Sequence, residues 1–112
     1  MSHIFAINTC GYHTDIAVTI YSNRIFIIIS HFKKLGSLIT VNRESALNQF
    51  SSNIFSTNVI FGKDEIDVHV AARYIAEQIN INKPLLLSIS LKDYNKEILK
   101  VITDNINQLK LW

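Results

Sequence analysis

Two segments of this sequence are apolar on both of the faces that a β-strand presents. Residues 25–29 read IFIII, and residues 85–91 read LLLSISL, where serine is the only polar residue type. A strand with one face in water alternates apolar and polar residues, whereas a strand that is covered on both faces does not. The fold must therefore cover both faces of any sheet that contains these segments.

Other patterns complete the predicted architecture. β-branched and aromatic runs between turn signals predict strands at residues 4–8, 15–21, 24–32, 37–41, 57–62 and 85–91. Apolar residues at helical spacing predict helices over residues 65–80 and 96–109, with the buried stripes Val68, Ala72, Ile75 and Ile79, and Leu99, Ile102, Ile106 and Leu109. Short connections favour an antiparallel meander over residues 15–41. We predict an α+β fold: an antiparallel or mixed sheet of five or six strands with two helices on one face.

The second face of this sheet needs a cover of its own, because two helices cover about one face. A partner chain is one candidate, and residues 42–56, a long segment rich in Ser and Asn, are the candidate within the chain. We predict a dimer packed through its sheets, with Ile25, Ile27, Ile28 and Ile29 in the interface. Residues 42–56 are expected to form a mobile loop.

Length and composition limit the classes of protein to consider. The 112 residues are expected to form a single domain, 1–112. A formal net charge of +2 without a basic stripe argues against a nucleic-acid partner. The single cysteine excludes an intrachain disulfide and a cysteine-based zinc site, and favours a reducing compartment. No signal peptide or membrane span is recognised, so we expect a cytoplasmic location, with the nucleus as a second compartment.

The stretch GKDEIDVHVAA, residues 62–72, concentrates carboxylates around one histidine. Helix initiation explains them: Asp64 is predicted to be the N-cap, with Asp67 at the capping-box position in the first turn. The alternative is a metal or acid–base site that uses Glu65 and His69, which are i, i+4 neighbours. Such a metal site needs a third ligand that the sequence does not suggest, so we predict no catalytic residue, no metal and no cofactor.

Three further side chains have two readings each. Lys33 and Lys34 form a small basic corner that is either a solvated turn or a binding point for an acidic client, and we take them as candidate client-binding residues. His31 is interpreted as a surface residue at a strand end rather than as a base. Trp112 either anchors the last helix to the core or lies in an interface, and we favour the anchor.

Four segments resemble the proteasome assembly chaperone 3 family in their order and spacing: FKKLGSLITV (32–41), VIFGKDEIDVHVAA (59–72), LLLSISLKD (85–93) and the terminal LW. The similarity runs over about residues 15–112, although Ile66 stands where the family commonly has proline and residues 42–56 match only in length. The resemblance implies a non-enzymatic chaperone that pairs with itself or with a subunit like proteasome assembly chaperone 4. It also implies that the pair binds proteasome α subunits and assists α-ring assembly of the 20S core particle. The alternatives are a scaffold subunit of another complex with a roadblock-like fold, or a small hydrolase.

Overall fold

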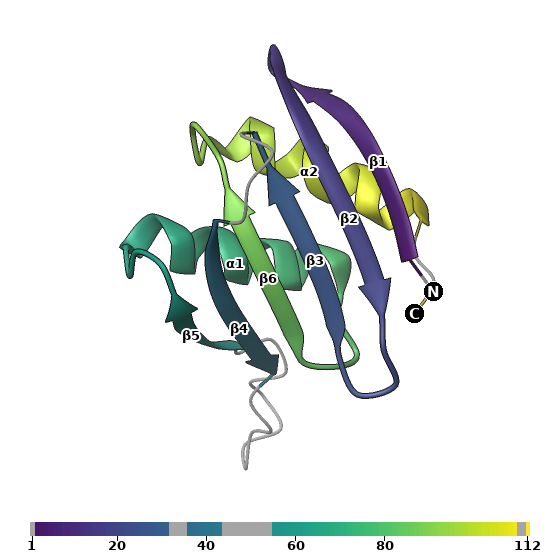
Figure 1. The fold of residues 1–112 in the computed structure, drawn as a ribbon, viewed down its shortest axis with the longest axis vertical. Helices are drawn as coiled ribbons and strands as arrows, with labels where there is room; N and C mark the ends of the chain where they lie inside the picture. The colour runs from purple at the N-terminus through teal and green to yellow at the C-terminus, as the bar shows by residue number, and fades with distance from the viewer. Residues whose placement is uncertain (1, 32–35, 44–54, 110–111) are drawn as a thin grey trace.

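The structure is a computed structural model that describes residues 2–31, 36–43, 55–109 and 112. The elements follow the chain in the order β1 (Ser2–Thr9), β2 (Tyr12–Ile20), β3 (Ile25–Ser30), β4 (Ser37–Arg43), β5 (Phe55–Phe61), α1 (Ile66–Ile79), β6 (Leu85–Ser90) and α2 (Lys96–Leu109). They form two layers, a mixed six-stranded sheet and a pair of helices on one of its faces (Figure 1). This confirms the predicted α+β fold class.

The strand order corrects the predicted meander. The sheet is ordered β1-β2-β3-β6-β4-β5, with β6 parallel to β3 and antiparallel to β4. The last strand of the chain therefore separates β3 from β4, which the meander had placed side by side. The prediction failed here because short connections favour pairing of neighbours, whereas β6 is apolar on both faces and is best covered at the centre of the sheet.

The chain must cross the end of β6 to pass from β3 to β4, and Gly36 lies at this crossing. Its backbone amide donates a hydrogen bond to Ser88 Oγ at 3.3 Å. A Cβ atom on Gly36 would lie 2.1 Å from the carbonyl oxygen of Ile89 and 2.6 Å from Ser90 Cβ. Glycine is therefore the only residue type that fits at position 36, because a side chain would clash with β6.

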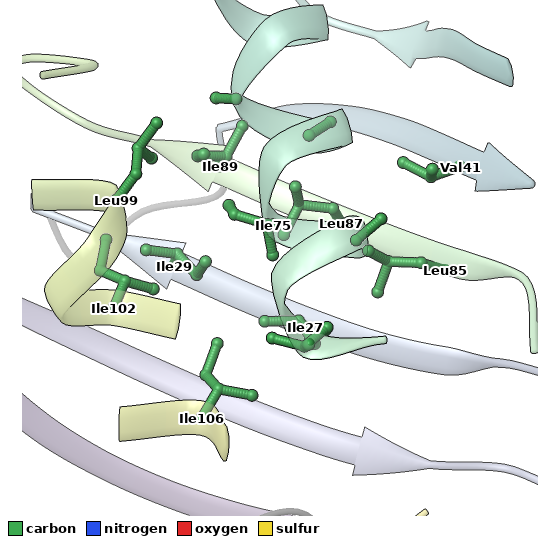
Figure 2. Packing of buried hydrophobic residues seen from close by; sticks show 14 of the residues in the cluster. Ile27, Ile29, Val41, Ile75, Leu85, Leu87, Ile89, Leu99, Ile102 and Ile106 are labelled. Atoms are coloured by element: carbon green, nitrogen blue, oxygen red, sulfur yellow. The ribbon is translucent and has the colours of Figure 1, made fainter. Parts of the chain in front are cut away.

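The core lies between the sheet and the helices, and it corrects part of the interface prediction. Ile25, Ile27 and Ile29 are 0% exposed within the single chain, so they belong to the core and not to a dimer interface. Figure 2 shows Ile27 and Ile29 among the side chains of both helices. Side chains alternate along a strand, so Phe26 and Ile28 point to the opposite face, where both are half-buried. Of the predicted interface residues, only Ile28 remains available to a partner.

Both helices bury their predicted apolar stripes, except that Leu109 is only half-buried. The helix α2 has the predicted bounds, with Leu99, Ile102 and Ile106 buried, and α1 begins at Ile66, one residue later than expected. Trp112 packs against the core, and its indole Nε1 donates a hydrogen bond to the carbonyl oxygen of Ile79 at 3.3 Å. This confirms Trp112 as an anchor of the chain's end on α1.

The predicted loop 42–56 is wrong at both of its ends. Asn42 and Arg43 belong to β4, while Phe55 and Ser56 begin β5, and the two strands pair there. Arg43 is fixed in place because its guanidinium donates hydrogen bonds to Asn80 Oδ1 and to the carbonyl oxygen of Ile81, each at 3.1 Å, and lies over the Phe55 ring. The remaining residues of the predicted loop, 44–54, lie outside the described residues.

Candidate interaction surface on the helix-free face

The face of the sheet that carries no described helix has a continuous uncharged surface. Strand register aligns one residue from each strand in a row across the sheet: Ile4, Ala17, Ile28, Ser88, Leu38 and Phe61. The next row contains Ser2, Thr19, Phe26, Leu86, Thr40 and Asn58. Neither row contains Asp, Glu, Lys or Arg. We call these two rows the open face.

Large and small side chains alternate along the first row. Ile28 lies between Ala17 and Ser88, and Leu38 follows on the far side of Ser88. Ile4 at one end is 82% exposed, and Phe61 at the other end is 67% exposed. Exposed apolar side chains on an uncharged face are typical of a binding surface.

One end of the open face is already covered by the chain itself. Ser88 and Ser30 point to this side of the sheet, yet they are 0% and 3% exposed. His31 and Gly36 contact this end, since the His31 amide donates to the Ser90 carbonyl oxygen at 2.8 Å and the Gly36 amide donates to Ser88 Oγ. A partner therefore has access to the part of the face that lies away from this crossing.

The carboxylate-rich stretch at the start of α1 is structural, although not in the predicted way. The N-cap is Glu65, without a side-chain capping bond, so the predictions of Asp64 as N-cap and of Asp67 in a capping box are wrong. Asp67 does lie in the first turn, where its carboxylate is favourable to the helix dipole. Asp64 instead bonds to His69, with 2.5 Å between Asp64 Oδ1 and His69 Nε2.

His69 connects the start of α1 to the edge strand β5. Its Nδ1 lies 2.7 Å from Thr57 Oγ1, on the side of the ring opposite Asp64. Because an ionised carboxylate only accepts, Nε2 carries the hydrogen, and a neutral ring then accepts the Thr57 hydroxyl at Nδ1. Thr57 is not among the predicted site residues, since nothing local to it in the sequence points to a partner 12 positions away. Within the described part of the chain, no group of three or more His, Cys, Asp or Glu side chains could hold a metal ion.

His31 is likewise held by its neighbours rather than free at the surface as predicted. Its Nδ1 accepts a hydrogen bond from the Lys92 backbone amide at 2.9 Å, and Nε2 lies 3.1 Å from Thr9 Oγ1. The ring stacks on Tyr12 with 5.0 Å between the centroids. Burial, and then the charge of Lys92, lower the pKa of His31 from its ordinary value of 6.5. The imidazole therefore connects β1, β2 and the end of β6 in its neutral form.

The remaining predicted binding residues, Lys33 and Lys34, lie outside the described residues. None of the helices that the structure describes is both long and apolar enough to cross a membrane. The described chain is thus a sheet with helices on one face and the uncharged open face on the other.

Known proteins share both the sequence pattern and this fold. Residues 27–109 match the family model described as Proteasome assembly chaperone 3. The chain belongs to the proteasome assembly chaperone 3 family. It is 33% identical over 110 residues to a family member from Nematostella vectensis, with 89% of this chain and 82% of the relative covered. It is 28% identical over 107 residues to the Homo sapiens member, with 92% and 87% covered.

A solved structure has the same fold as this member of the proteasome assembly chaperone 3 family. A chain from the crystal structure of a chaperone complex for yeast 20S proteasome assembly superimposes with a TM-score of 0.77. The match covers 97% of this chain and 98% of that chain. Because the two sequences are only 17% identical, the match supports the fold alone. Family membership identifies the chain as a non-catalytic assembly factor, so the hydrolase alternative is set aside.

Proposed function

We propose that this chain is a non-enzymatic chaperone that forms a dimer through its open face and binds proteasome α subunits during assembly of the α ring of the 20S core particle. The partner in the dimer is a second copy or a subunit like proteasome assembly chaperone 4. The relatives named Proteasome assembly chaperone 3 support the assembly role. We place this activity in the cytoplasm and also in the nucleus.

The observation that carries the dimer is the uncharged row that crosses the open face. A face that meets a copy of itself about a two-fold axis must not place like charges opposite each other, and this row contains none. Among the described residues on this side of the sheet, the contact between His13 Nε2 and Asp15 Oδ1, at 3.1 Å, lies outside the two rows, towards the turn between β1 and β2.

The two rows of the open face span about four residues along each strand. Six strands about 4.8 Å apart, with four residues at roughly 3.3 Å, give a flat area of about 400 Å². A standard interface buries roughly 800 Å² per partner, so the dimer is expected to include residues next to these rows. Lys33 and Lys34 are proposed to contact the client.

Purification of the tagged protein from its native cell, followed by mass spectrometry, tests the assembly role. We expect proteasome α subunits and a second small chaperone, with few mature β subunits. Recovery of an unrelated complex without α subunits would instead favour the scaffold alternative.

Variants of the open face test the mode of pairing separately. The Ile28→Asp variant should remain folded but lose its partner, because the charge is buried against an apolar surface only in the pair. The Gln78→Glu variant is the matched control, since it adds one negative charge at an exposed position on α1, on the other side of the sheet. Light scattering and circular dichroism measure pairing and folding. A folded Ile28→Asp variant that still pairs would exclude dimerisation through this face.

A further inference from the structure

The free edge of β1 and the C-terminal half of α2 form a groove that shares only Ile4 with the open face. The groove has a volume of about 410 Å³ and is lined by His3, Ile4, Phe5, Asn105, Gln108 and Leu109. A volume of several hundred cubic ångströms is typical of sites that take a ligand or a peptide segment. In Figure 1, α2 passes behind β1 near the start of the strand.

The β1 edge is open to hydrogen bonding along its length. β1 pairs with β2 on one side, and no described strand pairs with it on the other. A two-residue turn, Cys10 and Gly11, joins the strands, so Thr9 and Tyr12 form a hydrogen-bonded pair. The alternation of the ladder then directs the backbone amides and carbonyls of Ile4, Ala6 and Asn8 away from β2.

This edge also lacks the usual features that prevent pairing with other chains. β1 reads SHIFAINT, which contains no proline, lysine or glutamate. The other edge strand, β5, is less suited to an added strand, because its ladder shifts register opposite Leu38 and Ile39.

One polar atom at the groove has no hydrogen-bond partner. His3 lines the groove, and its Nε2 is buried and unpaired, the only such side-chain atom among the described residues. A buried polar group without a partner is unfavourable, and an entering hydroxyl or carbonyl group would satisfy it. Nearby, the carboxamides of Asn105 and Gln108 provide further donors and acceptors.

We propose that an extended, uncharged segment of another protein chain binds in this groove as an added strand, antiparallel or parallel to β1. Its backbone pairs with Ile4, Ala6 and Asn8, and its alternate side chains enter the groove between β1 and α2. The lining residues include no Asp, Glu, Lys or Arg, so an uncharged segment is the one that fits. The described end of this chain does not fill the groove, since Trp112 is bonded to the Ile79 carbonyl on α1.

Peptide selection tests the proposal with a library of random peptides displayed on phage. The Ala6→Pro variant removes the outward amide of β1 without removing a bond to β2, and Ala6→Val is the matched control that keeps this amide. Peptides selected on the wild-type protein should bind Ala6→Val equally well and Ala6→Pro at least tenfold more weakly. They should also slow amide hydrogen exchange at Ile4, Ala6 and Asn8.

Replacement of the unpaired imidazole gives a second readout. The His3→Phe variant keeps a ring of similar shape and should weaken the selected peptides about fivefold, the loss of one hydrogen bond. The proposal is overturned if no selected peptide distinguishes Ala6→Val from Ala6→Pro, or if the protected amides lie on β5 or on the open face. It is also overturned if Ala6→Pro, and not Ala6→Val, abolishes self-association, because the occupant is then a second copy of the chain. These outcomes do not depend on whether the Ile28→Asp variant loses its partner.

Discussion

Replacement of Gly36 by alanine tests the tightest contact in the fold. A Cβ atom at this position would lie 2.1 Å from the Ile89 carbonyl oxygen and 2.5 Å from the Ile89 carbonyl carbon. Ordinary contacts of a Cβ atom are longer than 3.4 Å, so the crossing segment and β6 would have to separate by about 1 Å. β6 cannot move easily, because it is paired on both sides, with β3 and with β4.

The expected loss of stability follows from this geometry. Overpacking costs typically 1–3 kcal/mol, occasionally more, and a clash with backbone atoms belongs at the upper end. We therefore expect Gly36→Ala to lower the free energy of unfolding by about 3 kcal/mol. Gly11→Ala is the matched control: Gly11 has φ +95° but no atom within 4 Å of the added Cβ, so its cost is conformational, about 1–2 kcal/mol.

Urea denaturation followed by circular dichroism measures both variants. The expected order is wild type, then Gly11→Ala, then Gly36→Ala, with an unchanged dependence on urea concentration. If Gly36→Ala were as stable as Gly11→Ala or more so, the close crossing of β6 by the connection from β3 to β4 would be wrong. If Gly36→Ala did not fold at all while Gly11→Ala did, the result would agree with a close contact between Gly36 and β6.

Three further predictions concern His31, His69 and the buried face of β3. The pKa of His31 is lowered in the fold, so the stability contributed by its neutral ring is fully present above about pH 6.5 and is lost as the pH falls towards the lower folded pKa. The urea midpoints of wild type and His31→Gln should therefore converge as the pH falls through this range. Midpoints that stay equally far apart would contradict this prediction. His69→Ala should cost about 1–2 kcal/mol in urea denaturation, because it removes the hydrogen bonds to Thr57 and to Asp64, whose 75% exposed side chain then binds water instead. An effect below 0.5 kcal/mol, which is roughly that of an ordinary surface substitution, would contradict the structural role of His69. Ile27→Asp should abolish folding by circular dichroism, because it buries a charge at a position that is 0% exposed, and a folded Ile27→Asp protein would contradict the assigned core.

The sequence predicts most of the secondary structure but only part of the interaction surface. Helix α2 is correct at both ends, because a regular apolar stripe and clear turn signals define it. The apolar pattern of residues 25–29 correctly indicates a strand, and the cover that it predicts is present on the helix side, where Ile25, Ile27 and Ile29 are buried. The cover of the other face stays a prediction. The pattern does not say which side faces the helices, although strict alternation already separates Ile25, Ile27 and Ile29 from Phe26 and Ile28.

The other errors come from contacts between residues far apart in the chain. Asp64 has the residue type and position of an N-cap, yet its carboxylate bonds to His69, which in turn depends on Thr57 in another element. The position of β6 in the sheet is another such case. The turn signals between β3 and β4 carry no information about a strand that comes later in the sequence. Local structural propensity depends on residues that are near in the sequence. Both errors arise where a contact with a residue far away in the sequence determines the structure.

The central position of β6 has a consequence for the way this protein is made. Leu85 of β6 pairs with Ile25 of β3, 60 positions earlier in the chain. Until β6 has left the ribosome, the strands β1 to β3 and the hairpin of β4 and β5 are two separate halves with no ladder between them. Such long-range pairing is slow, and it leaves apolar strands exposed while synthesis continues. A chaperone that assists the assembly of other proteins would thus itself need protection from aggregation while it is translated.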